Sequence, residues 1–323
     1  MNKFLKHILL FLPFTALMYL VFLTIWGGFC PQFLRKNMLG PQGFYYTYER
    51  LQEARTTTDI DMLFLGGSRT YRGFDTRIFE VAGFKTFNLG TSSQTFIQTE
   101  VLLKRYLPQM NPKLVVFELS LGAFMFNDGM ESALDIVAND IHHKHAWQMV
   151  TQYNDISLYN TWLYAGIWSF LRQNQLNWKI ETFQKKLYAQ MKGADTYVSG
   201  GYVEKELRYF KKNRQGKFTL HFNEKMFDAF ERCLDVCRQN GVDVMLVQSP
   251  YTQGFYRSVA NRSDFDSRIN SYNLPHYNYN NIMPLNDSLC FYDAIHLNQI
   301  GAKVFSSKLA HDIDSLGILK YKY

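Results

Sequence analysis

The residues Asp61-Met62-Leu63-Phe64-Leu65-Gly66-Gly67-Ser68-Arg69 give the clearest indication of the fold. Four apolar residues in a row, ended by two glycines, predict a short strand buried on both faces, as in a parallel sheet covered by helices. A serine directly after such a strand lies at the carboxyl end of the sheet, where α/β proteins bind their ligands. The stretch therefore predicts a sheet-based fold with Ser68 at its ligand-binding edge.

Further apolar runs alternate with helical stretches along the chain. We expect strands over residues 62–65, 86–90, 114–119, 242–248 and 289–292. We expect helices over 94–107, ended by Pro108, and over 223–239, followed by Gly241; a last helix follows the capping residue Asn298. This alternation predicts an α/β fold, a three-layer sandwich with a mainly parallel, flavodoxin-like sheet. Gly90 and Ser120 also follow strands, so we expect them at the same edge as Ser68.

Residues 128–222 interrupt the alternation, and their length predicts a helical insertion or lid within the domain. Within them, residues 156–171 carry no charged side chain but several Tyr and Trp. Because Trp and Tyr favour the bilayer interface, this segment could lie on a membrane. An ordinary buried lid helix is the plainer interpretation.

Residues 8–28 carry no charged side chain, and they match the roughly 20 residues that cross a bilayer. The run is longer than an ordinary signal-peptide core and lacks a small-residue cleavage site, so we expect a retained signal anchor over 1–30 rather than a cleaved peptide. Lys3 and Lys6 favour a cytoplasmic N-terminus, although Arg35 and Lys36 weaken that orientation. The sequence thus predicts a single-pass membrane protein: anchor 1–30, linker 31–57 and an extracytoplasmic domain 58–323, in the periplasm or at the cell surface.

The chain has 35 Lys and Arg against 28 Asp and Glu among 323 residues, a formal net charge of +7. Such a charge suits anionic partners, including lipid head groups and cell-wall polymers, or simply a solvated surface. The basic residues are scattered and accompany no nucleic-acid motif, so we expect no nucleic-acid partner.

A serine, a carboxylate and a histidine together suggest nucleophilic chemistry. Near the C-terminus stands Asp293-Ala294-Ile295-His296-Leu297-Asn298. A serine hydroxyl is a weak nucleophile at neutral pH, and an imidazole base oriented by an acid activates it. Taken singly, Ser68 could be a helix cap, and Asp293 with His296 could be a turn-stabilising pair. The combination favours a catalytic triad.

This arrangement resembles the SGNH (GDSL-like) serine hydrolase superfamily over residues 61–323, excluding the insertion. The resemblance implies that Ser68 is the nucleophile, His296 its base and Asp293 the acid that orients the imidazole. The family's second block supplies a glycine to the oxyanion hole, and Asn88-Leu89-Gly90 matches it through Gly90. The Ser68 amide would be a second donor.

Two features depart from the general family pattern. The first block reads Gly-Gly-Ser-Arg, and the third block's Gly-x-Asn-Asp is absent, with Ser120 and Asn127 nearby. The third oxyanion donor is therefore unassigned. The Gly-x-Ser-Arg block, the anchor and the Asp-x-x-His-Leu-Asn ending are similar to the membrane-anchored subgroup. That subgroup includes the D-alanine transfer protein of lipoteichoic acid synthesis and the alginate O-acetylation proteins.

The resemblance implies transfer or removal of an acyl, acetyl-like group on an extracytoplasmic, cell-surface glycopolymer. It also implies a membrane-bound O-acyltransferase as partner, and no cofactor. Two alternatives remain open. One is a catalytically silent accessory protein that binds a glycopolymer beside an acyltransferase, and the other is a free carbohydrate esterase.

Other residues are weaker candidates for the substrate site. Arg69 and Arg72 could receive an anionic group or form salt bridges. Tyr251 and Arg257, beyond the strand end, could line a pocket.

Histidines and cysteines do not predict a metal site. His142, His143 and His145 have no matching carboxylate set, which favours a polar turn. Four cysteines show no metal-ligand spacing, and the pair Cys233 and Cys237 is expected to be buried and unlinked.

Overall fold

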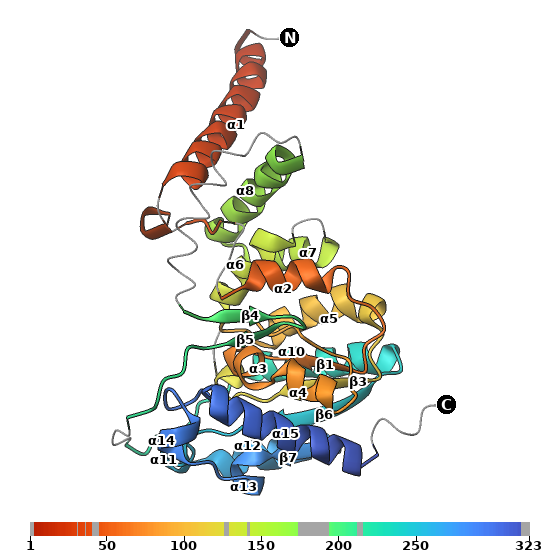
Figure 1. Ribbon diagram of the computed structural model, residues 1–323. Helices are drawn as coiled ribbons and strands as arrows, with labels where there is room; N and C mark the ends of the chain where they lie inside the picture. The colour runs from red at the N-terminus through yellow and green to blue at the C-terminus, as the bar shows by residue number, and fades with distance from the viewer. Residues whose placement is uncertain are drawn as a thin grey trace. The chain divides into compact units, whose positions relative to one another are not determined.

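The main sheet has five strands in the order β2-β1-β3-β6-β7, and each neighbouring pair is parallel (Figure 1). In that order the strands are β2 (Thr86–Asn88), β1 (Met62–Leu65), β3 (Leu114–Glu118), β6 (Asp243–Gln248) and β7 (His276–Asn278). The computed structural model describes residues 3–30, 32–35, 37–40, 45–125, 129–140, 143–173, 194–211 and 216–317. The order is that of flavodoxin-like sheets, with β1 and β3 at the switch point. The predicted α/β class and mainly parallel sheet are confirmed.

Helices cover both faces of this sheet. Phe64 of β1 contacts Phe74 and Phe79 on the side of α3 (Ser68–Gly73), α4 (Thr76–Val81) and α15 (Gln299–Ser315). Phe117 of β3 contacts Phe96 and Phe230 on the other side, in α5 (Phe96–Met110) and α10 (Glu224–Gln239). Because successive strand side chains point to opposite faces, the fully apolar β1 and β3 pack into both layers.

Smaller elements surround the sandwich. Around it lie η2 (Leu121–Phe124), α11 (Gln253–Ser258), α12 (Arg262–Asn270), α13 (Tyr279–Ile282) and α14 (Asp287–Cys290). The short helix η1 (Gln32–Leu34) belongs to a different compact unit of the chain. Strands β4 (Thr196–Val198) and β5 (Tyr202–Glu204) form a separate antiparallel hairpin.

The expected linker 31–57 contains helix α2 (Thr47–Ala54), which is bound to the hairpin. Glu53 accepts hydrogen bonds from the Tyr197 hydroxyl at 2.5 Å and the Ser199 hydroxyl at 2.6 Å. The buried Arg50 donates to the Gly201 carbonyl at 3.0 Å. These contacts attach α2 to the hairpin.

The expected strand over 289–292 is wrong. Residues 289 and 290 form the second half of α14, and the side chain of Asn286 caps the first N–H groups of this helix. The fifth strand is β7, which pairs with the end of β6. Its sequence, His276-Tyr277-Asn278, has no apolar run because the strand is short and only half-buried at the sheet edge.

Pro108 does not end its helix, as we expected it to. Helix α5 continues to Met110 and ends at Asn111, which has a left-handed φ of 44° and donates its N–H to Leu107. Proline removes one helical N–H donor, and here the last turn tolerates that loss. The other predicted helix ends are confirmed: Asn298 caps α15 by accepting from the Gly301 N–H at 3.0 Å, and Gly241 follows α10 with a φ of 65°.

The chain divides into two compact units, residues 1–44 with 133–193, and residues 45–132 with 194–323. Helix α6 (Met130–Asn139) crosses this division, while α1 (Lys3–Phe29), α7 (Lys144–Tyr153) and α8 (Ile156–Gln173) belong to the first unit. In that unit α8 packs against α1. Tyr164 and Trp168 form a buried cluster with Leu23, and a side chain at Gly27 would overlap the Tyr164 ring.

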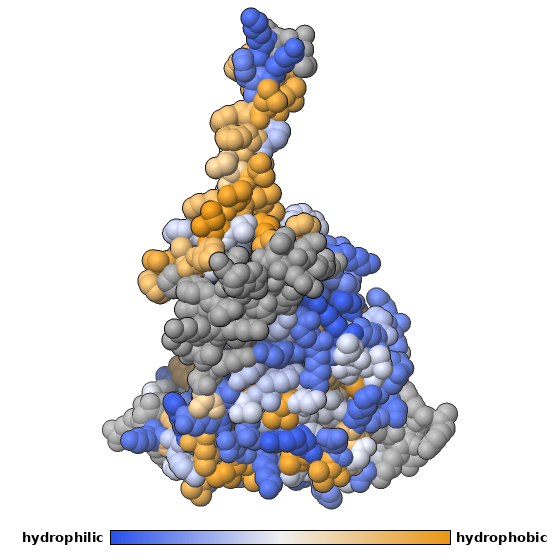
Figure 2. Space-filling view, turned by 45° about the horizontal axis from the view of Figure 1, so that its top comes forward, coloured by the Kyte–Doolittle hydropathy of each residue, from blue (hydrophilic) through white to orange (hydrophobic). Residues whose placement is uncertain are grey.

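Among the described residues, α1 is the one helix long and apolar enough to cross a membrane. It has 27 residues, and its most apolar window has a mean hydropathy of 2.4 and is 6% buried. Figure 2 shows hydrophobic residues along the helix and hydrophilic ones at its N-terminal tip. Length and composition are thus those of a single span or a signal sequence.

Candidate active site

Ser68 is held by a tight turn between β1 and α3. Gly66 has a φ of 149°, and a side chain there would overlap the Thr70 hydroxyl. The turn ends the buried strand abruptly, so Ser68 becomes the first residue of α3 and is half-exposed at the carboxyl edge of the sheet.

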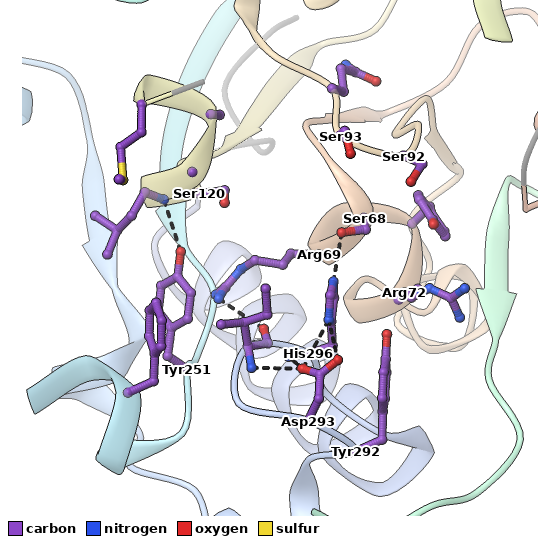
Figure 3. Close-up of a pocket in the computed structure, with 18 of the residues that line it drawn as sticks. Ser68, Arg69, Arg72, Ser92, Ser93, Ser120, Tyr251, Tyr292, Asp293 and His296 are labelled. Carbon is purple, nitrogen blue, oxygen red and sulfur yellow. Dashed lines mark hydrogen bonds and ion pairs between the residues drawn. The ribbon is translucent and has the colours of Figure 1, made fainter. Parts of the chain in front are cut away.

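The loop between α14 and α15 carries Asp293 and His296 to the same edge. His296 Nε2 lies 2.7 Å from Ser68 Oγ, and His296 Nδ1 lies 2.8 Å from Asp293 Oδ2 (Figure 3). Asn298 fixes the end of the loop, since it caps α15 and its side-chain amide donates to the Leu289 carbonyl at 2.8 Å. The three residues predicted from the sequence are thus joined in one hydrogen-bonded chain.

Asp293 is arranged to remain ionised. Burial alone would raise the pKa of its carboxyl, but the hydrogen bond and charge of His296 outweigh burial and lower it. The backbone N–H groups of Ile295 and His296 add to this effect by donating to Asp293 Oδ1 at 2.9 and 2.8 Å. A carboxylate beside Nδ1 favours the proton on that nitrogen, which leaves Nε2 free to accept the Ser68 proton.

Tyr292 supports the histidine ring from one side. The two rings are stacked, with centroids 5.3 Å apart and an interplanar angle of 3°. Burial raises the pKa of the Tyr292 hydroxyl, with nearby Arg72 acting in the opposite direction. The ring therefore stays neutral and restricts His296 to its orientation toward Ser68.

Arg69 forms a salt bridge, one of the two roles expected for it from the sequence. Its Nε donates to Glu118 Oε1 at 3.0 Å, and its Nη1 donates to the Ile295 carbonyl at 3.0 Å. Its Nη2 donates to the Ser249 hydroxyl at 2.7 Å, and its guanidinium lies 3.2 Å from the ring centroid of Tyr251. Because all three nitrogens are used internally, Arg69 connects the ends of β3 and β6 to the loop that carries His296.

Arg72 lines the pocket but is also engaged. Its Nη1 lies 2.9 Å from Asp195 Oδ2, and its guanidinium lies 4.8 Å from the Tyr45 ring. Lys205 lines the same side, 3.3 Å from Asp195 and 5.1 Å from the Tyr292 ring. Two cations therefore share one carboxylate beside the Ser68–His296 pair, and a role of Arg72 toward substrate stays a prediction.

Gly90 is placed differently from the expected oxyanion donor. Its N–H donates to Asn88 Oδ1 at 3.0 Å, and a side chain there would lie 3.0 Å from the Gly67 carbonyl and the Tyr71 N–H. A packing requirement thus explains this glycine. The pocket is instead lined by the following residues, Ser92 and Ser93, which lie beside Ser68 (Figure 3).

Ser93 carries a signal that sequence reasoning missed. It has a left-handed φ of 54°, an uncommon conformation for a residue with a side chain. Its hydroxyl donates to Glu131 at 2.9 Å, whereas its N–H has no acceptor in the described part of the chain. No residue type in Thr91-Ser92-Ser93 predicts this, since the turn depends on contacts made after folding.

Some of the remaining residues predicted for the substrate site line the pocket, and others do not. Ser120 and Tyr251 line the pocket, and the Tyr251 hydroxyl accepts from the Leu121 N–H at 3.0 Å. Arg257 is exposed and does not line it. Asn127 lies outside the described residues. The pocket has a volume of about 580 Å³, within the usual range for small-molecule sites.

The histidines His143 and His145, outside this pocket, have structural roles in α7. His143 caps α7 and His145 bonds to Gln148 at 2.8 Å, while His142 lies outside the described residues. In the parts of the chain that the structure describes, no cluster of His, Cys, Asp and Glu could hold a metal. Cys233 and Cys237 are buried free thiols, and burial raises the pKa of both, the second to about 12.

Comparisons with known proteins give a limited result. No family model and no curated protein matches the chain. Among solved structures it is similar to a GDSL-like lipase from Bacteroides thetaiotaomicron, at 12% identity over 83% of this chain and 98% of that one, with a TM-score of 0.41. It is also similar to a two-domain esterase active on acetylated mannans, at 14% identity over 89% of this chain and 57% of that one, with a TM-score of 0.35. Overlaps this low carry no conclusion about activity, so function must be argued from the site itself.

Proposed function

We propose that this protein is a serine esterase or O-acyltransferase of the SGNH (GDSL-like) type, acting through Ser68, His296 and Asp293. One observation carries the proposal: an unbroken hydrogen-bonded chain from Asp293 through His296 to Ser68, opening into a pocket. Nucleophile, base and orienting acid within hydrogen-bond reach are the geometric requirement for an activated serine.

The reaction would proceed in two steps. Ser68 Oγ attacks the ester carbonyl carbon while its proton passes to His296 Nε2, and the departing alcohol takes that proton as the C–O bond breaks. The acyl group then rests on Ser68 as an ester. Water or a sugar hydroxyl attacks the acyl carbon and gives its proton to His296. As the ester bond to Ser68 breaks, His296 passes that proton to Ser68 Oγ. Asp293 stays ionised throughout and stabilises the imidazolium.

The oxyanion would be bound by backbone N–H groups of the two loops at the strand ends. Ser68 stands at the first position of α3, where an N–H has no partner within the helix. Ser93 offers a second N–H without an acceptor among the described residues and lines the same pocket. We propose this pair in place of Ser68 and Gly90, because the Gly90 N–H is occupied by Asn88.

The substrate and location belong to the same proposal. We propose that α1 anchors the protein and that the site faces the extracytoplasmic side, where it transfers or removes an acyl group on a cell-surface glycopolymer. A membrane-bound O-acyltransferase would supply the acyl group for transfer. The composition of α1 and the sequence resemblance support this part.

Fluorophosphonate labelling of the detergent-solubilised full chain tests the nucleophile. We expect one adduct by intact mass, mapping to Ser68. We expect Ser68→Ala to abolish labelling and His296→Ala to lower its rate by on the order of 10³-fold or more. Ser267→Ala is the matched control, since Ser267 is an exposed serine of α12 that does not line the pocket, and it should label like the unmodified protein.

An unlabelled but folded protein would contradict the esterase proposal and favour the silent accessory protein. Labelling at another serine would contradict the assignment of Ser68. Labelling of Ser68 that persists in His296→Ala would show that the histidine is not its base.

A further inference from the structure

The pocket has two arms of different chemistry, one on each side of the Ser68–His296 pair. Figure 3 shows Ser120 and Tyr251 on one side and Arg72 and Tyr292 on the other. The first side is lined by apolar groups, namely Leu121, Ala123, Met125, Phe218, Leu220 and Phe255. We call these six residues the apolar arm.

Direct contacts place the apolar arm on the Tyr251 side. The Leu121 N–H donates to the Tyr251 hydroxyl at 3.0 Å, and the rings of Tyr251 and Phe255 stack with centroids 5.0 Å apart. The ring centroid of Phe255 in turn lies 5.7 Å from that of Phe218. The arm is therefore a continuous apolar wall, and its inner end meets the Arg69 guanidinium, which lies over the Tyr251 ring.

Hydrogen bonds hold the outer part of this wall in place. The Phe218 N–H donates to the Ser258 carbonyl at 2.9 Å, and the Leu220 N–H donates to Asn261 Oδ1 at 2.8 Å. Phe218 is 36% exposed and Leu220 only 4%. The wall is thus fixed to the main domain and has one surface open to a ligand.

The opposite arm is unsuited to an alkyl chain. Arg72 and Lys205 share Asp195 there, and the rings of Tyr45 and Tyr292 lie against these cations. Burying alkyl groups against charged side chains removes water from those charges without replacing it. A polar leaving group or acceptor fits this arm better.

We propose that the apolar arm binds the alkyl chain of the acyl group, and that the enzyme prefers a medium-chain acyl group such as hexanoyl over acetyl. This inference rests on the proposed esterase function and concerns the acyl group that Ser68 carries. An acetyl group would leave most of the apolar arm in water. Each further methylene buried there is worth roughly a fourfold gain in kcat/KM.

The test is hydrolysis of p-nitrophenyl acetate, butyrate and hexanoate by the full chain in detergent. We expect kcat/KM to rise with chain length, to a hexanoate-to-acetate ratio on the order of 10². Phe218→Lys puts a charge on the wall and should lower that ratio at least about tenfold. Tyr209→Lys is the matched control, since Tyr209 is 52% exposed and does not line the pocket.

The variant Lys205→Met tests whether the acyl chain-length preference belongs to the apolar arm and not to the opposite arm. It alters the opposite arm, so it should change kcat/KM for both esters by a similar factor and leave their ratio within about twofold. A fall of the ratio in Lys205→Met but not in Phe218→Lys would overturn the assignment of the arms.

The chain-length proposal and the proposed function fail in distinguishable ways. If Ser68 is labelled by fluorophosphonate but acetate is hydrolysed as fast as hexanoate, the chain-length proposal is wrong and the esterase proposal stands. If Ser68 is unlabelled and no ester is hydrolysed, both are overturned.

Discussion

Arg69 stabilises the position of the catalytic loop through hydrogen bonds that involve neither Ser68 Oγ nor the His296 ring. Its guanidinium bonds to Glu118 of β3, to Ser249 after β6 and to the Ile295 carbonyl, one residue before His296. A planar guanidinium can satisfy all these acceptors at once, whereas a lysine ammonium reaches only some of them. The position of His296 relative to Ser68 therefore depends on Arg69.

We expect Arg69→Lys to lower kcat by about 10- to 100-fold, because small misplacements of a catalytic group cost that much. KM should change by less than about twofold, since the nitrogens of Arg69 are bonded to groups of the protein itself. Steady-state kinetics on p-nitrophenyl hexanoate give both constants. Arg257→Lys is the matched control, because Arg257 is exposed and outside the pocket. A rise in KM with unchanged kcat would instead return Arg69 to the substrate-binding role expected from the sequence.

Individual residues differ in how far the sequence could predict them. Asp293 and His296 were predictable because three residues of loop bring their side chains together, and Ser68 because a strand and two glycines precede it. The roles of Arg69, Gly90 and Ser93 were not. Each depends on a partner distant in sequence or on a backbone angle that no residue type announces.

The turn between β1 and α3 is the element that makes Ser68 available. Its first glycine, Gly66, combines a φ of 149° with close contact to Thr70 and Glu118. An alanine there meets two penalties, backbone strain of about 1–3 kcal/mol and an overlap with a buried neighbour. We expect Gly66→Ala to lower Tm by roughly 4 °C or more in a thermal melt and to abolish fluorophosphonate labelling.

Alanine substitutions at two other glycines distinguish the cost of backbone strain from the cost of the overlap. Gly83 has a φ of 88° but open space where a side chain would lie, so Gly83→Ala should cost only the strain, about 1–2 kcal/mol. Gly216 has open space and no positive φ, so Gly216→Ala should lie within about 0.5 kcal/mol of the unmodified protein. Equal effects at all three positions would refute the steric account of the turn.

Elements in the interior were predictable, and those at the edge were not. Strands β1, β3 and β6 are runs of apolar residues because both sheet faces are covered, and such runs are visible in the sequence. Strand β7 pairs on one side only and is half-buried, so its residues carry no apolar pattern. The apolar residues at 289–292 resemble a strand, but Asn286 starts a helical turn there.

The division of the molecule into two compact units could not be predicted from the sequence. The expected division into an anchor 1–30, a linker 31–57 and a domain 58–323 with a helical insertion at 128–222 stays a prediction. In the structure the N-terminal segment groups with residues 133–193, through contacts such as the Tyr19 hydroxyl to Asn160 Oδ1 at 2.5 Å. Contacts across 141 residues of chain leave no trace in local composition. The aromatic residues of α8, interpreted as a lid or an interfacial segment, pack in part against α1.

Membrane attachment is the property of the whole molecule that most needs a test. We expect the full chain to remain in the membrane pellet after alkaline carbonate extraction. Arginine near the middle of a span costs about 2.5–3.5 kcal/mol per residue, so the double variant Phe14→Arg with Leu17→Arg should move the protein to the supernatant. Both residues lie on exposed parts of α1, at 60% and 59% exposure, so lost packing is a small part of the effect.

Val81→Arg is the matched control, because Val81 is an apolar residue of α4 with 89% of its surface exposed and lies outside α1. It should stay in the pellet with the unmodified protein. Intact mass of the pellet then separates an anchor from a signal peptide, since a retained α1 keeps the mass of the full chain and a cleaved one lowers it by about 30 residues. Release of the unmodified chain by carbonate would contradict the anchor. The proposed esterase would then have to meet its substrate in solution, and the uncharged run of residues 8–28 in α1 would need another explanation.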